Sequence, residues 1–562
     1  MKRFLLVLFS FFVLAASGQV NTTSLLDTSF NSIGLKTIDL GLGNDKLLNI
    51  YELADGKILS TSTPLSQYVV VSKLNQDGTI DNNFGLNGLT KLYFNNTDSV
   101  VYSVNSSGIL VKPNGKILLY SNVTHKKYVV NDPVNPDGLG TISNNYSYFY
   151  EKSYLHQLNL DGSLDTSFAN HGVLNIGDNI NEDYKYPVGY SMLILNDGKI
   201  LLNGAFGRPD QGSMHSFYLT NGFLYRINVD GTIDSTFAVE GLYLNSSFSL
   251  HHLSLNQNGN IVLGGIRYLL GTSYSVPDFC MLTEGGSQYL NFTPYFPLGD
   301  SFKFVPASMS IGISNEILFF GTYSLKCDTC YSYRLSIGKF LSNGRLDTSY
   351  ATNGFKMYDF NNNSGYANNH IQLNDGSIIA LAKVPATTQR ALLFKLNENG
   401  DLDSQFGSSG SYYLHSDIST YSNYKLINRI IYNYNNSKIM VGGTYITQNT
   451  SSSKPLLVRL NDQSIPLGLI DNPTITQSIL AYPNPIQNGV LNLSYELTNN
   501  QDVSIDLYDI KGQLITRLMP QQTRVNGKNT ETLMLPQSLS AGQYILRITA
   551  GNYQKGVSVV VN

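Results

Sequence analysis

The chain has 562 residues, of which 42% are hydrophobic and 14% are charged, and its formal net charge at pH 7 is −3. This length suffices for several cores, or for one repeat array plus a smaller domain. The small net charge excludes the electrostatic footprint of a nucleic-acid or anionic-membrane binder, so no nucleic-acid partner is predicted. Because charged residues are few, Asn, Ser, Thr, Gly and Tyr must supply the polar surface, and this composition favours strands and turns.

The first residues, MKRFLLVLFSFFVLAASGQV, have the layout of a secretory signal peptide. Lys2 and Arg3 are positive, an apolar run covers 4–16, and small residues precede Gly18. We predict a signal peptide over residues 1 to 18, cleaved after Gly18 or one residue earlier, and a short lead over 19–24. No cysteine lies near this position, so no lipoprotein anchor is expected. No later stretch approaches the roughly 18 apolar residues of a membrane helix, so the mature protein is predicted to be exported without a transmembrane segment.

Two short motifs alternate along the next part of the chain. The first is KLNQDGTIDNNFGLNG at 73–88, and further copies begin at Gln157, Arg226, Lys339 and Lys395, with a degenerate copy at 281–292. A seventh copy is split between LLDTSF (25–30) and VRLND (458–462). The second motif is a turn followed by an apolar strand, and it occurs at 53–60, 111–119, 195–204, 255–265, 313–321, 373–382 and 435–443.

The repeat period and the strand pattern predict an all-β repeat fold. The aromatic positions of the first motif, 30, 84, 168, 237, 292, 350 and 406, give a basic unit of about 55 residues with insertions. Each unit contains four short strands, which in the first unit are expected at 34–41, 46–53, 57–62 and 68–75. A seven-bladed β-propeller with four-stranded blades over 25–462 is predicted, because a closed ring accounts for the split motif. An open β-solenoid is the alternative.

The first motif has the chemistry of a structural turn. Asn75 and Asp77 precede Gly78, which tolerates the positive φ of a tight reversal, and Asp81 can accept bonds from backbone N–H groups. Phe84 is expected to pack between neighbouring units. Asn75, Asp77 and Asp81 are also weak calcium candidates, although the bidentate Glu of an EF-type loop is absent. No other cofactor is predicted.

These units resemble the delta-60 repeat family over roughly 25–462. The resemblance implies a propeller-like fold in an exported bacterial protein and implies no defined reaction.

The units differ mainly in their insertions. Insertions at 121–154 and 205–221 are expected between the third and fourth strands of units two and three, on the face opposite the turns, where they often form binding surfaces. The ligand-surface candidates are Tyr128, Tyr146, Tyr148, Tyr150, Arg208 and Tyr218. Unit five carries Cys327 and Cys330, for which a loop disulfide, idle thiols, a redox pair or half a metal site are the alternatives.

The sequence contains no GxSxG, HExxH or P-loop motif. We therefore predict a noncatalytic binding or adhesion protein with an extracellular glycan or protein ligand. One alternative is a polysaccharide-degrading enzyme that uses carboxylates in variable segments, such as Glu151, Asp178 and Asp210. The other alternative is a structural role in the surface layer.

After a linker over 463–478, the chain changes character. Residues 479–562 show short alternating segments separated by Gly, Pro and Asn, and this pattern predicts a small Ig-like β-sandwich. The alternation is clearest in VSIDLY at 503–508.

This segment also carries four ordered motifs. They are YPNP (Tyr482, Pro483, Asn484, Pro485), LYDIKGQLI with Gly512, LSAGQYILRI with Gly542 and Tyr544, and the ending at Lys555. Together they resemble the type A sorting domain of the type IX secretion system. The resemblance implies transport across the outer membrane of a Gram-negative bacterium, with the type IX machinery as partner, and release or attachment at the cell surface. An Ig-like spacer is the alternative.

Overall fold

The structure is a computed structural model, and the residues that it describes form strands and turns without any helix. It describes residues 25–40, 44–64, 68–94, 100–130, 145–176, 186–209, 217–268, 275–292, 302–312, 314–326, 331–351, 354–360, 365–384, 390–414, 423–433, 436–446, 452–462, 479–487, 489–497, 500–509, 514–536, 539–550 and 553–561. The predicted signal peptide, the predicted linker over 463–478, and Cys327 and Cys330 lie outside these residues. The chain divides into two compact units, Met1–Ser464 and Ile465–Asn562.

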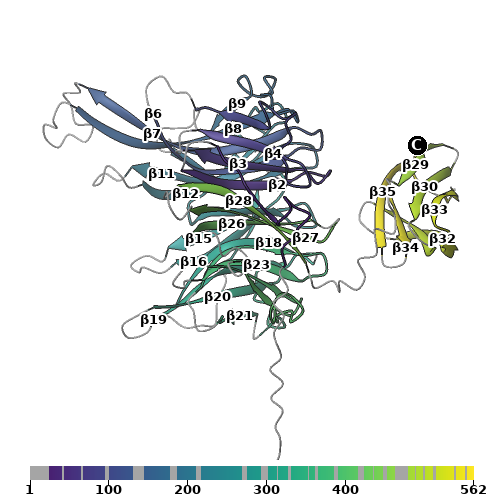
Figure 1. The fold of residues 1–562 in the computed structure, drawn as a ribbon. Helices are drawn as coiled ribbons and strands as arrows, with labels where there is room; N and C mark the ends of the chain where they lie inside the picture. The colour runs from purple at the N-terminus through teal and green to yellow at the C-terminus, as the bar shows by residue number, and fades with distance from the viewer. Residues whose placement is uncertain are drawn as a thin grey trace, which may run out of the picture. The chain divides into compact units, whose positions relative to one another are not determined.

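The first unit contains seven four-stranded antiparallel sheets (Figure 1). Blade 1 comprises β2 (Asp45–Glu52), β3 (Ile58–Pro64), β4 (Val69–Leu74) and β5 (Leu89–Leu92). Blade 2 comprises β6 (Val100–Val111), β7 (Ile117–Val130), β8 (Asn145–Leu158) and β9 (Val173–Ile176). Blade 3 comprises β10 (Tyr186–Ile194), β11 (Ile200–Pro209), β12 (Phe217–Ile227) and β13 (Leu242–Asn245). Blades 4 and 5 comprise β14 (Ser249–Leu255), β15 (Ile261–Tyr268), β16 (Ser275–Leu282) and β17 (Gln288–Phe292); and β18 (Phe302–Ile311), β19 (Ile317–Lys326), β20 (Tyr331–Phe340) and β21 (Phe355–Tyr358). Blade 6 comprises β22 (Tyr366–Gln372), β23 (Ile378–Val384), β24 (Arg390–Leu396) and β25 (Ser411–Tyr413).

Blade 7 closes the ring. It combines β26 (Asn423–Asn433), β27 (Lys438–Ile446) and β28 (Ser453–Asn461) with β1 (Leu35–Thr37) from the start of the chain. β1 pairs antiparallel with β28, with Leu35 opposite Val458 and Thr37 opposite Leu456. The first strands of successive blades also contact one another around the ring, including β2 with β26. The seven-bladed propeller is therefore confirmed, and the open solenoid is wrong.

The predicted grouping of strands into units is wrong by one strand. Residues 34–41 were assigned to the first unit, whereas β1 is the outermost strand of blade 7. The insertion at 121–154 therefore lies between the second and third strands of blade 2, β7 and β8, and not between its third and fourth. The repeated motif at 73–88 connects the third and fourth strands within a blade, β4 and β5.

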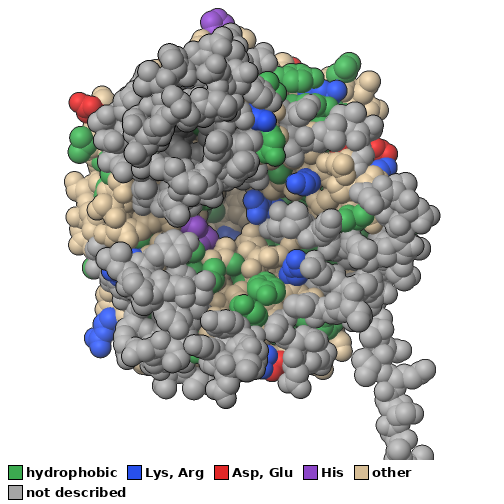
Figure 2. All heavy atoms as spheres, turned by 90° about the vertical axis from the view of Figure 1, so that its left-hand side faces the viewer, with side chains coloured by type: hydrophobic (Ala, Val, Ile, Leu, Met, Phe, Trp, Pro, Cys, Tyr) green, Lys and Arg blue, Asp and Glu red, His purple; other side chains and the backbone are tan. Residues whose placement is uncertain are grey.

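Two faces of the propeller follow from this topology. Both repeated turns, such as those at 53–57 and 75–88, lie at one end of the strands, which we call the turn face. The opposite end, which includes the ends of β7 at Val130 and of β8 at Asn145, is the connection face. β7 and β8 have 14 residues each, against 7 in β3 and 6 in β4, and Figure 1 shows β6 and β7 projecting on the left. The connection face, seen in Figure 2, is hollowed at its centre. The predicted separation of turns and insertions onto opposite faces is confirmed.

In four copies the repeated turn is seen to couple its blade to the next one. The residue that follows the motif aromatic donates its backbone N–H to a carbonyl in the next blade's turn, in the pairs Asn31 to Asp77 (2.7 Å), Gly85 to Asp161 (2.7 Å), Ala169 to Asp230 (2.6 Å) and Ala238 to Gly285 (2.9 Å). The aromatic ring itself is buried against the glycine of that next turn. Phe84 packs in this way on Gly162, and Phe168 packs on Gly231.

Two separate constraints favour glycine at this turn position, its positive φ and the close approach of the preceding blade's aromatic ring. Gly231 has a φ of +91°, which favours glycine, and an added Cβ would lie 2.9 Å from Phe168 Cε2. Gly259 has a φ of +78° in another turn, but an added Cβ there would have no neighbour within 4 Å. The two positions thus separate backbone strain from the contact between blades.

The second unit contains seven strands around a core of its own. They are β29 (Leu480–Gln487), β30 (Val490–Leu497), β31 (Gln501–Asp509), β32 (Leu514–Arg524), β33 (Gly527–Met534), β34 (Gly542–Ala550) and β35 (Tyr553–Val561), in the order β32-β31-β34-β35-β29-β30-β33. Buried residues from both ends of this order, such as Leu493 and Ile505, join one apolar cluster. The all-β prediction is confirmed, while the Ig-like sandwich stays a prediction.

The two glycines yield a prediction about the coupling of blades. We expect Gly259→Ala to lower the free energy of unfolding by about 1 kcal/mol through backbone strain alone. Gly231→Ala should cost about 3 kcal/mol, because overpacking against Phe168 and the adjacent Ala169 of the preceding blade adds to the same strain. Thermal and denaturant unfolding of both variants would measure the difference, and equal losses would contradict the proposed role of the aromatic contact.

Candidate functional site

The weak calcium candidates lie in the turn that connects β4 and β5. Asp77 Oδ1 accepts hydrogen bonds from the Thr79 backbone N–H (2.9 Å) and the Thr79 hydroxyl (2.7 Å), and the Asn75 amide donates to the same hydroxyl (3.0 Å). Asp81 is buried and receives Lys57 Nζ at 2.9 Å. The cation that Asp81 faces in the structure is therefore an ammonium group of the same blade.

The Asp81 contact recurs around the ring. The hydrogen bond from Lys57 holds the pKa of Asp81 below its usual value, and Lys73 Nζ lies 3.8 Å from the same carboxylate. In three other blades the equivalent aspartate meets the lysine of its own blade's second motif and a polar side chain from the start of the first motif. The pairs are Lys116 (2.8 Å) and Gln157 (2.8 Å) on Asp165, Lys199 (2.9 Å) and Arg226 (2.7 Å) on Asp234, and Lys438 (3.3 Å) and Arg459 (2.7 Å) on Asp27.

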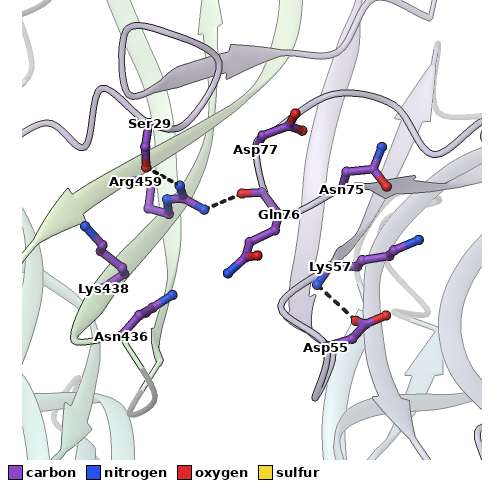
Figure 3. A pocket seen from close by; sticks show the side chains of 9 residues that line it. All are labelled: Ser29, Asp55, Lys57, Asn75, Gln76, Asp77, Asn436, Lys438 and Arg459. Carbon is purple, nitrogen blue, oxygen red and sulfur yellow. Dashed lines mark hydrogen bonds between the residues drawn. The ribbon is translucent and has the colours of Figure 1, made fainter. Parts of the chain in front are cut away.

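In two first motifs the arginine at the start also joins two blades. Arg226 lies over the Phe237 ring (4.8 Å to its centroid) and donates to the Glu284 carbonyl of the next turn (2.8 Å). Arg459 does the same over Phe30 (4.7 Å), and it donates to the Gln76 carbonyl across the ring closure (Figure 3). These repeated contacts support a scaffold role for the motif aspartates.

In blade 2 a different residue makes the contacts that the motif cation makes elsewhere. Gln157 stands where five other copies carry a cation, and Lys112 from the turn after β6 makes the equivalent contacts. Its ammonium group lies 5.3 Å from the Phe168 centroid and 3.2 Å from the Val229 carbonyl. The sequence analysis did not predict that cations would pair with the motif aspartates. A signal was present, because a lysine follows the turn in four copies of the second motif.

The ligand-surface candidates are only partly described. Tyr128, Tyr146 and Tyr148 lie in the distal parts of β7 and β8, and Arg208 and Tyr218 lie opposite each other in β11 and β12, but these side chains lie outside what the structure describes. Tyr150 is 8% exposed and stacks on His125, with 5.2 Å between ring centroids. The prediction that Tyr150 is presented to a ligand is therefore wrong, because its ring packs within blade 2.

Other exposed side chains flank the connection from blade 1 to blade 2 on the connection face. Tyr93 directly follows β5, and Val100 and Tyr102 lie at the start of β6; their exposed fractions are 59%, 60% and 59%. Tyr68 lies beside Tyr93 (5.2 Å between centroids), and Lys91 lies over the Tyr68 ring. We call Tyr93, Val100 and Tyr102 the β5–β6 corner.

The predicted sorting residues lie in the second unit. Tyr482, Pro483, Asn484 and Pro485 are exposed in β29, and Asn484 bonds to β35 through the Val560 N–H (2.8 Å) and the Ser558 carbonyl (3.1 Å). Gly542 begins β34 and Tyr544 donates to the Ser540 carbonyl (2.8 Å). Lys555 lies in β35 with an undescribed side chain, and Gly512 lies outside the described residues.

Within the described residues, no group of three or more His, Cys, Asp or Glu side chains is placed to hold a metal ion. The described part of the chain also contains no helix with the length and apolarity needed to cross a membrane.

Comparison with known proteins identifies the C-terminal segment. Residues 480–562 match the family model described as a secretion system C-terminal sorting domain. This match indicates export by the type IX secretion system, to the cell surface or the medium, and an interaction with its machinery. No curated protein matches the chain.

Solved structures with similar folds are distant. The polysaccharide lyase Uly1 is 11% identical over 75% of this chain and 90% of its own, with a TM-score of 0.40. An α-L-arabinanase from Penicillium chrysogenum is 12% identical over 66% of this chain and 96% of its own, with a TM-score of 0.38.

Buried histidines in the propeller predict sensitivity to acid. Burial lowers the pKa of His156 to about 4, whereas an unfolded histidine titrates near 6.5. Between these values the unfolded chain binds more protons than the folded one, so stability falls as the pH drops from about 6.5 towards 4. At pH 5, His156 alone should cost about 2 kcal/mol relative to neutral pH.

We expect His156→Leu to lose less of its melting temperature between pH 7 and pH 5 than the unmodified protein loses. His171→Leu, at an exposed position, serves as the matched control and should retain the full decrease. Melting curves at several pH values would test this, and an unchanged decrease in His156→Leu would contradict the prediction.

Proposed function

We propose that the protein is an exported, noncatalytic binding or adhesion protein whose connection face contacts an extracellular glycan or protein. The proposal rests mainly on the β5–β6 corner, where Tyr93, Val100 and Tyr102 are more than half exposed. Tyrosine offers a large, stiff contact area at a small cost in conformational entropy, and it is enriched at recognition surfaces. The elongated strands of blade 2 support the same face as the contact surface.

The turn face is a poor candidate for the main binding surface. Its recurring aspartates and cations are already engaged with one another and with the next blade. A ligand that recruited these groups would have to break contacts that hold the ring together. The resemblance of the units to delta-60 repeats fits this scaffold role and stays a prediction.

The polysaccharide-degrading alternative has one described carboxylate among its candidates. Burial raises the pKa of Glu151, which accepts a hydrogen bond from the Thr124 hydroxyl (2.6 Å). Asp178 and Asp210 lie outside the described residues. Release of reducing ends from a panel of polysaccharides would favour the enzyme, and neither binding nor turnover would favour a structural role in the surface layer.

The binding proposal predicts the effect of changing the β5–β6 corner. The purified protein should bind at least one component of a glycan or extracellular-protein array, and Tyr93→Ser combined with Tyr102→Ser should weaken that binding at least tenfold. Val239→Ser is the matched control, because Val239 is 76% exposed beside a turn-face motif. Equal binding by the double variant and the control would contradict the assignment of this face.

Processing gives a separate prediction. If the sorting domain is removed during export, the mature protein in the medium or at the cell surface should lack the segment matched at 480–562. Intact-mass measurement on the exported protein would show this loss. A mature mass that includes Lys555 would contradict removal while leaving the export route unchanged.

A further inference from the structure

The second unit carries an apolar row across three neighbouring strands on the side of its sheet that faces solvent. Leu514 of β32 lies opposite Tyr508 of β31, and Tyr508 lies opposite Ile545 of β34. Residues that lie opposite each other on antiparallel strands share one face of the sheet. The other face holds the core, because the adjacent Leu507 and Leu546 are buried in it. The side chains of Leu514 and Ile545 are 50% and 37% exposed.

The solvent side of β30 and β33, in the same unit, carries polar pairs instead. Asn492 lies opposite Thr532 and accepts a hydrogen bond from its hydroxyl (2.8 Å), and Ser494 lies opposite Thr530. Antiparallel sheets that bury one face usually present polar side chains on the other, so these pairs follow the expected alternation. The apolar row departs from it, and adjoining exposed apolar side chains with a polar border are typical of interaction surfaces.

A charged cluster borders the apolar row. Asp506, in the same face of β31, is 2% exposed and accepts two hydrogen bonds from Arg517 (2.7 and 3.3 Å). Arg547 Nη2 lies 3.8 Å from the same carboxylate, and its guanidinium group lies 4.2 Å from the centroid of the Tyr508 ring. One carboxylate therefore faces two guanidinium groups, and both arginine side chains stay more than a third exposed. The cluster has one positive charge in excess, which is complementary to an acidic side chain on a partner.

The partner of this surface follows from the family of the unit. Residues 480–562 match a secretion system C-terminal sorting domain, and this match indicates an interaction with the type IX machinery. The apolar row comes from the motif segments at 507–515 and 539–548, which are separate in the sequence and become neighbours in the sheet. The segments that carry the resemblance to sorting domains thus also build the exposed apolar row.

We propose that the apolar row and the charged cluster together form the surface with which the C-terminal unit docks on a protein of the type IX secretion machinery. We call this surface the sorting face, and it comprises Leu514, Tyr508, Ile545, Arg517, Asp506 and Arg547. The partner presents an apolar surface with an acidic side chain beside it. Burial of the leucine and isoleucine side chains supplies affinity, and the arginines fix the orientation of the complex. The ligand of the propeller plays no part in this docking.

The first test measures export of the full chain in a bacterium that has a type IX secretion system. We expect Leu514→Asp combined with Ile545→Asp to lower the exported fraction at least tenfold and to leave the chain inside the cell, because two carboxylates would replace the apolar contact. Met534→Asp combined with Val525→Asp is the matched control. These two side chains are 68% and 64% exposed in the same unit but lie outside the sorting face, so export should stay unchanged.

The charged cluster is tested by Arg547→Gln. This variant should also export less, because the excess positive charge is lost while Asp506 keeps its hydrogen bonds from Arg517.

A crosslinking measurement decides the question even if an aspartate variant fails to fold. The photoreactive residue p-benzoylphenylalanine, placed at Ile545 of the full chain, should crosslink during export to a component of the type IX machinery that mass spectrometry identifies. The same residue placed at Met534 should give no such crosslink.

Three outcomes would overturn the proposal. They are normal export of the Leu514→Asp, Ile545→Asp variant, an equal loss of export in the Met534→Asp, Val525→Asp control, and crosslinks to the machinery from position 534 but not from position 545.

Discussion

The propeller depends on a contact that recurs in five blades, the packing of the motif aromatic against the turn glycine of the next blade. Around this contact, a cation crosses the aromatic ring and donates to the next turn, while a buried aspartate holds the cation in place. A ring has no free end, so the contact must also be made where the chain's two ends meet. Phe30 packs on Gly78 there, and Arg459, held by Asp27 432 residues away in the chain, donates to the next turn. Splitting one motif between the ends therefore makes closure of the ring a condition for completing the last coupling.

The network tolerates a change of residue as long as the same groups are contacted. In unit two, a lysine from a different turn replaces the cation that Gln157 cannot supply, and it reaches the same kind of ring and the same kind of carbonyl. Such a replacement is expected if what is preserved is a positive charge over an aromatic ring, paired with a buried carboxylate. The repeat is then better defined by the contacts that its side chains make than by the identities of its residues.

The sequence was sufficient for the parts of the fold that local chemistry determines. Turn residues, short β-rich segments and a regular period predicted seven units of four strands, because each signal lies within a few residues of the structure that it specifies. The strand grouping failed because the partner of β1 lies more than 400 residues away in β28. The contact of Asp81 with Lys57 was missed because it spans 24 residues between two motifs, and the burial of Tyr150 because it depends on stacking with His125 from the neighbouring strand.

The same constraint explains where variation is tolerated. Every turn on the turn face must satisfy two blades at once, so a change there affects a contact that the ring requires. Among the described residues, the connection face shows no such repeated coupling, and the third strands of the blades differ in length from 6 residues in β4 to 14 in β8. The ring closure is an exception on the turn face, since its turns come from the two ends of the array. Asn436-Ser437 replaces the usual glycine turn there while Arg459 still makes the required coupling, so this change of turn residues does not break the ring.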